Sequence, residues 1–78
     1  MNNARRKILK DAEKQLKDIC NKIENVKDDE QCAYDSLPES LQMSDKAEQM
    51  IENIERLEDL VCNLEDYIGE YSSEIEYI

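Results

Sequence analysis

A stripe of apolar residues with heptad spacing runs through the second half of this chain to its last residue. The apolar positions recur at alternating intervals of three and four, and acids fill most of the positions between them. The pattern predicts an amphipathic helix over residues 45–76 that packs against an apolar partner. The stripe consists of Ala47, Met50, Ile54, Leu57, Val61, Leu64, Ile68, Tyr71, Ile75 and Ile78.

A second stripe in the first half predicts another helix over residues 3–34, interrupted only at Glu30. Its members are Leu9, Ala12, Leu16, Ile19, Ile23, Val26 and Ala33. Both stripes are wider than one line of contact requires, and such a width favours a bundle in which each helix has more than one neighbour. The widening residues are Ile8 and Cys20 in the first helix and Ile51, Leu60 and Tyr67 in the second.

The connection between the helices carries several cap signals. We expect Asn3 to cap the first helix and Ser44 the second. Ser36 and Glu39 have the spacing of a capping box around Pro38, which predicts a short helical turn over residues 37–42. We expect the apolar residues of this connection to close the end of the core: Leu37, Leu41 and Met43.

Charge predicts the direction of the two helices. Residues 1–27 carry +4, whereas residues 28–78 carry −14, which gives the net charge of −10. Cations at the start of the first helix and acids at the end of the second are both unfavourable for the helix dipoles. An antiparallel hairpin brings these ends together, so that each offsets the other. We therefore predict an all-α fold with one domain, residues 1–78, built as an antiparallel two-helix hairpin.

A single hairpin of this size has a small core, and 78 residues are near the lower limit for independent stability. We therefore expect a homodimer in which two hairpins form a four-helix bundle. The residues expected in its core are Leu9, Leu16, Ile19, Ile23, Ile54, Leu57, Val61, Leu64 and Ile68.

The residue types for catalysis and metal binding are sparse. The chain has no histidine and one glycine, and Cys20, Cys32 and Cys62 form no C-x-x-C pair. Carboxylate pairs on a wet helix face lack the pocket that general acid–base catalysis needs. We expect no enzymatic activity, no catalytic or metal-ligating residue and no cofactor. No apolar run approaches the length of a membrane span, and the expected location is the cytoplasm, without membrane association.

Three surfaces remain as candidates for binding. The first is a basic stripe on the first helix that could contact phosphates or be a solvated face, made of Lys7, Lys10, Lys14 and Lys17. The second is an acidic row on the second helix that could imitate a phosphate backbone or only aid solubility, made of Glu48, Glu52, Glu55, Asp59 and Asp66, with Glu70 beyond its far end. The third is the tip, either a recognition patch or a structural cap, with Tyr34, Asp35, Leu37, Glu39 and Leu41.

The segment from Glu30 to Gln42 reads E-Q-C-A-Y-D-S-L-P-E-S-L-Q. With the preceding N-x-x-R-R-K at residues 2–7, it resembles a group of short acidic helical-hairpin proteins from gut and Gram-positive bacteria, their phages and other mobile elements. These share the connection E-x-A-[FY]-D-x-[LM]-P-E-S-[LI]-Q. After Ser44 this chain has Asp45-Lys46-Ala47, where the group tends to have Glu-Arg-Gly-Glu. The resemblance implies a mobile-element accessory protein and carries no function with it.

Two functions are consistent with these observations. The chain could be a binding module, such as a phage or mobile-element inhibitor that blocks a basic, nucleic-acid-binding surface of a host defence protein. Alternatively, it is a structural coiled-coil module whose self-association is its function. Binding of nucleic acid by the basic stripe is disfavoured by the −14 of the remaining residues.

Overall fold

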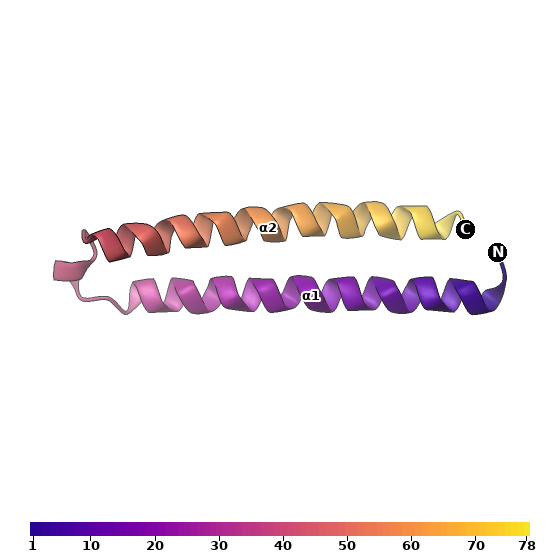
Figure 1. Cartoon of the computed structure of the whole chain (residues 1–78), viewed down its shortest axis with the longest axis horizontal. Coiled ribbons are helices and arrows are strands. Elements are labelled where there is room, and N and C mark those ends of the chain that lie inside the picture. Colours follow the sequence, from indigo (N-terminus) through magenta and orange to yellow (C-terminus); the bar gives the residue numbers. More distant parts are fainter.

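The computed structural model describes residues 1–78 and is an antiparallel pair of long helices (Figure 1). Helix α1 spans Asn3–Asp35, a short 3₁₀ turn, η1, spans Glu39–Leu41, and helix α2 spans Asp45–Glu76. The resulting rod measures 61 × 15 × 12 Å. The all-α hairpin is confirmed, with both helices within one residue of their predicted bounds. Neither helix holds an apolar stretch sufficient to cross a membrane.

Of the expected helix caps, one forms as predicted and two differ. Ser44 caps α2 as expected, because its Oγ accepts a hydrogen bond from the Ala47 N–H at 3.2 Å. The cap of α1 is Asn2 rather than Asn3, and its Oδ1 accepts from the Arg5 N–H at 2.9 Å. The capping box of Ser36 and Glu39 does not form. Ser36 instead ends α1, and its own N–H donates to the Cys32 carbonyl at 3.0 Å.

The core is a single line of side chains between the helices, which we call the seam. Six residues are buried, and five of them lie on α2: Cys20, Ala47, Met50, Ile54, Val61 and Ile68. Cys20, Val61 and Ile68 form the centre, with Leu16, Ile23 and Leu64 packed around them. Leu9 and Leu57 are half-buried along the same line.

Helix α1 meets α2 through a different line of residues from the one expected. Leu9, Leu16 and Ile23 lie in the seam as predicted, but Ile19, Val26 and Ala33 are exposed. The positions one residue later, Cys20, Lys27 and Tyr34, take their places. Two stripes on α1 share the leucines and Ile23, and the structure uses the one that contains Cys20. Of the residues expected in a dimer core, Ile19 alone does not face the other helix of its own chain.

Polar contacts across the seam fix how the helices are aligned. The Tyr71 hydroxyl donates to the Leu9 carbonyl at 2.7 Å, and Cys20 Sγ lies 4.0 Å from the Val61 carbonyl oxygen. At the open end, Arg6 Nε donates to the Ile78 carbonyl at 3.1 Å. The oppositely charged helix ends adjoin as expected, but both ion pairs of the molecule lie within α1, and none joins the helices.

Gly69 is an exposed interior position of α2 where alanine is expected to stabilise the fold. A methyl group at this Cα has open space around it, with no atom within 4 Å. Since glycine costs about 1 kcal/mol relative to alanine in a helix interior, Gly69→Ala should raise the free energy of unfolding by about that amount in urea titrations. An unchanged or lower stability would show that α2 is not a regular helix at this point.

The Tyr71 hydroxyl gives a second test of the alignment. Tyr71→Phe removes its bond to the Leu9 carbonyl and should lower the free energy of unfolding by about 0.5–1.5 kcal/mol. Tyr77→Phe is the matched control, because the Tyr77 side chain is almost fully exposed at the helix end. Equal losses in the two variants would contradict the alignment described here.

Candidate functional site

The acidic row of α2 is fully displayed to solvent. Because α2 turns its apolar stripe toward α1, its opposite surface carries the carboxylates of the row. All five predicted members are exposed: Glu48, Glu52, Glu55, Asp59 and Asp66. No lysine or arginine lies within ion-pair distance of any of them, since the two ion pairs are Lys17–Glu13 and Lys27–Asp28. The row is therefore a set of uncompensated negative charges on a rigid rod.

Acids of α1 extend this row on one side of the hairpin near the tip. Lys27 lies in the seam, and its pKa is raised by a hydrogen bond to Asp28, with burial acting in the opposite direction and the carboxylates of Asp28, Glu58 and Glu24 adding to the rise. Glu24 and Asp28 of α1 thus lie close to Glu58 of α2 around a single cation. We call these three acids the acidic cluster.

The acidic cluster was missed in the sequence, because it depends on how the two helices are aligned. The only local signal is the continuation of the seam at intervals of four and three from Leu16 through Cys20 and Ile23 to Lys27. Extending the seam along that line predicts that Lys27 lies between the helices, with the acids adjacent to it close by.

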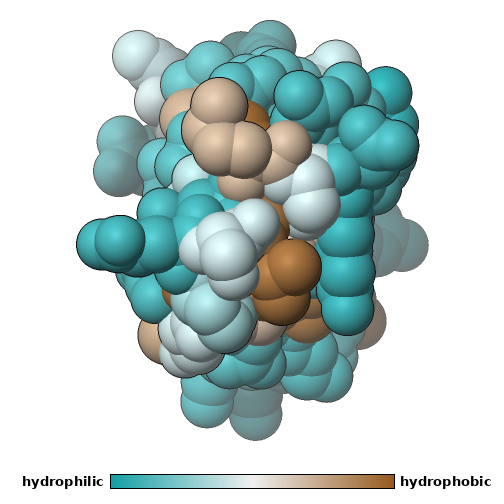
Figure 2. Space-filling model, turned by 90° about the vertical axis from the view of Figure 1, so that its left-hand side faces the viewer, coloured by the Kyte–Doolittle hydropathy of each residue, from teal (hydrophilic) through white to brown (hydrophobic).

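The tip displays apolar side chains within an acidic surround. Tyr34 and Leu37 are half-buried, whereas Leu41 is half exposed and Met43 is 89% exposed. Figure 2 looks onto this end and shows apolar surface bordered by hydrophilic residues. The expectation that Leu37, Leu41 and Met43 close the core is wrong for the latter two. Ala47 and Met50 close it instead, because the first turn of α2 already covers the end of the seam.

The loop at the tip is held by local hydrogen bonds. Gln42 Nε2 donates to the Leu37 carbonyl at 3.3 Å, and Ser44 Oγ donates to the Leu41 carbonyl at 2.6 Å. Gln31 Nε2 donates to Asp35 Oδ1 at 3.1 Å. Asp35 and Glu39 are exposed beside the apolar residues. The structure therefore brings all five predicted tip residues to one end of the rod, next to the start of the acidic row.

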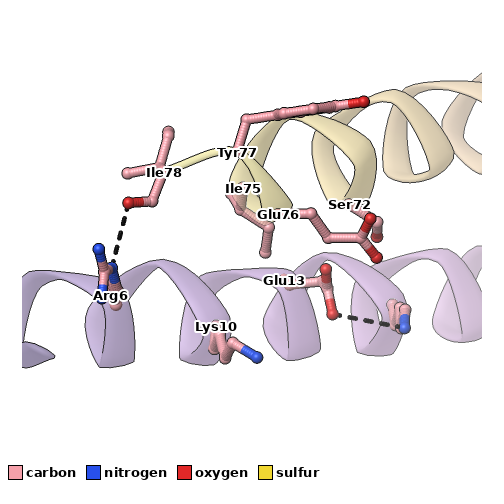
Figure 3. Close-up of a pocket in the computed structure, with 9 residues that line it drawn as sticks. Arg6, Lys10, Glu13, Ser72, Ile75, Glu76, Tyr77 and Ile78 are labelled. Atoms are coloured by element: carbon pink, nitrogen blue, oxygen red, sulfur yellow. Dashed lines mark hydrogen bonds and ion pairs between the residues drawn. The ribbon is translucent and has the colours of Figure 1, made fainter. Parts of the chain in front are cut away.

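The basic stripe lies near the opposite end. Lys10 and Lys17 line an open hollow of about 800 Å³ between the helix ends, together with Arg6 (Figure 3). The same hollow is lined by the carboxylates of Glu13 and Glu76, and Lys17 pairs with Glu13 at 3.6 Å. Mixed charge of this kind weakens the attraction for a phosphate backbone, which needs cations without neighbouring acids.

The potential metal ligands of the chain are dispersed, and one of its three thiols is buried. No three histidine, cysteine, aspartate or glutamate side chains converge as metal ligands do. Burial raises the pKa of the Cys20 thiol, and the carboxylates of Glu65 and Glu24 raise it further. Since the thiolate is the reactive form, Cys20 is an inert core residue at neutral pH.

Comparison with known proteins adds no assignment. No family model, no curated protein and no solved structure matches this chain. The candidate site therefore rests on the residues and geometry described above.

Thiol labelling tests the burial and electrostatics beside the acidic cluster. With a maleimide at pH 7, we expect Cys32 and Cys62, which are exposed, to react about tenfold or more faster than Cys20. Because the pKa of Cys20 is raised, this difference in rate should persist until the pH is well above the pKa of a free thiol. In urea the three rates should become similar. Equal rates in the native protein would contradict the placement of Cys20 in the seam.

Proposed function

We propose that this protein is a non-enzymatic binding module that attaches to a basic surface of another protein. The observation that carries the proposal is the acidic row of α2, exposed and without a paired cation, which continues into the acidic cluster. Carboxylates repeated along a rigid helix can occupy sites that a protein has built for the phosphates of a nucleic acid.

The tip supplies the second element of such a contact. An interface draws most of its affinity from a few apolar or aromatic anchors, with charged residues at the rim that steer association. Leu41 and Met43 are exposed anchors of this kind beside Asp35 and Glu39. The resemblance of the tip segment to proteins of phages and mobile elements makes a nucleic-acid-binding defence protein of the host cell a candidate partner.

A second function, self-assembly as a coiled-coil module, is favoured by a different observation. Large apolar side chains are exposed along the middle of the rod, at Ile19, Val26 and Leu60 among others. In this function the acids serve only solubility. The two functions are compatible, because the acidic row and these apolar residues lie on different faces.

Charge reversal on the acidic row separates the two functions. The triple variant Glu52→Lys, Glu55→Lys and Asp59→Lys should weaken capture of a basic partner from the native cell by about tenfold or more, equivalent to about 1.4 kcal/mol. Binding by tagged protein, followed by competition with duplex DNA, measures this effect. DNA should displace the partner if the acids occupy a nucleic-acid site.

The matched control is Asp11→Lys, Asp18→Lys and Glu76→Lys, which changes the charge equally with exposed acids distant from the tip. It should retain the partner. If both triple variants bind as the unaltered protein does, or if both lose the partner to the same degree, the acidic row is not a specific contact surface.

A further inference from the structure

The two sides of the hairpin that flank the seam differ in chemistry. In each helix, the residue just before a seam residue in the sequence lies on one side of the seam, and the residue just after it lies on the other side. Because the helices run in opposite directions, the residues that precede the seam in α1 and in α2 fall on the same side of the rod. We call this side the near-neutral flank. It runs in alternating steps of three and four residues from Arg5 to Ala33 in α1 and from Lys46 to Glu74 in α2.

The near-neutral flank collects the exposed apolar residues of the rod. Away from the helix ends, every large apolar side chain that is exposed lies on it except Ile51: Ile8, Ile19, Val26, Leu60 and Tyr67. Its acids are Asp29, Glu70 and Glu74, and its cations are Arg5, Lys22, Lys46 and Arg56. The flank thus carries +1 in a chain of −10, so the remaining residues carry −11.

The opposite side, which we call the charged side, carries four lysines and eight acids at its 18 positions from Lys7 to Asp35 in α1 and from Glu48 to Glu76 in α2. Lys10, Lys17 and Ser72 follow seam residues and line one hollow, which confirms that such positions share a side. Glu24, Asp28 and Glu58 also follow seam residues, and all three carboxylates act on the charge of Lys27. Two copies of an acidic chain can approach closely only where acids are scarce, and that condition is met on the near-neutral flank.

The hairpin leaves more surface exposed than a compact monomer of its mass. The chain of 9.2 kDa has an accessible surface of 6182 Å². A monomer of this mass typically exposes about 4,900 Å², so this hairpin exposes about 1,300 Å² more. A stable dimer covers about 800 Å² or more on each subunit. The excess is sufficient for a pair of hairpins packed side by side.

We propose that two copies of this chain pair through their near-neutral flanks, with α1 over α1 and α2 over α2 in antiparallel directions. Cys20 lies against Val61. Because the helices are antiparallel, Lys17, three residues before Cys20, is level with Leu64, three residues after Val61. A two-fold axis at that level places Ile8 over Val26 of the second copy and Arg5 over its Asp29. The same axis places Leu60 over Tyr67 of the second copy.

The charges on α2 favour this direction over the alternative. In the antiparallel pair, Arg56 lies between the levels of Glu70 and Glu74 of the second copy, so opposite charges meet. If the two hairpins pointed the same way, α1 would lie over α2. Arg5 would then approach Glu74 of the second copy, but Arg56 would lie between the levels of Lys22 and Asp29, so that repulsion would offset attraction there. The antiparallel pair also leaves the acidic row of α2 exposed on both copies. The inference does not depend on the proposed partner of that row.

Two glutamate substitutions on opposite sides of α2 test the interface. Leu60 is 51% exposed on the near-neutral flank, and Ile51 is 37% exposed on the charged side. In sedimentation equilibrium, the unaltered protein and Ile51→Glu should have twice the mass of one chain. Leu60→Glu should raise the dissociation constant of the dimer about a hundredfold or more, because a two-fold symmetric interface contains the substitution twice, once from each copy. A single-chain mass for the unaltered protein, or equal dissociation of both variants, would overturn the proposal.

A charge exchange tests the direction and remains informative if Leu60→Glu fails to fold. Arg56→Glu should weaken pairing, and adding Glu70→Arg and Glu74→Arg should restore it. Within one chain these positions are about 21 and 27 Å apart along α2, so rescue can only act between copies. Absence of rescue would rule out the antiparallel pair. The Glu52, Glu55 and Asp59 reversal should still pair, so that loss of partner binding and loss of self-association are distinguishable.

Discussion

Two helices side by side share one line of contact, and this constraint governs the whole molecule. The line is filled by small and branched side chains around Cys20, Val61 and Ile68, and it is aligned by the hydroxyl of Tyr71 on the Leu9 carbonyl. The remaining side chains are half-buried at the edges of this line or exposed to solvent. The molecule is only two helices wide, and the surfaces considered above as binding sites all lie on its outer faces.

Those outer faces differ in charge, and the two proposed interactions would use different faces. The acids are concentrated on the back of α2 and around Lys27, where they repel other acidic chains and attract basic ones. The flank that carries Ile19 and Leu60 has few acids and a nearly balanced charge. The proposed self-association and the proposed attachment to a basic protein would therefore use different surfaces, and one would not block the other. Pairing would also present two copies of the acidic row on one particle, which strengthens binding to a repeated or extended target.

The fold was largely predictable from the sequence because its signals are local. Apolar periodicity gave both helices, and Ser44 gave the start of α2. The details that escaped prediction depend on alignment in three dimensions. On α1, stripes through Ile19 and through Cys20 share Leu9, Leu16 and Ile23, and only the packing against α2 distinguishes them. The acidic row could be predicted because it follows from one helix alone, whereas the acidic cluster needs residues of both helices. Met43 was misplaced because Ala47 and Met50 already close the seam.

Hydroxyl-radical footprinting at increasing protein concentration tests most directly whether a second copy covers the near-neutral flank. Tyr67 is 71% exposed on that flank, and Tyr77, 89% exposed at the helix end, is an internal reference in the same chain. We predict that oxidation of Tyr67 falls several-fold as the concentration rises, while oxidation of Tyr77 stays constant. Constant oxidation of both tyrosines, or equal protection of both, would contradict pairing through this flank.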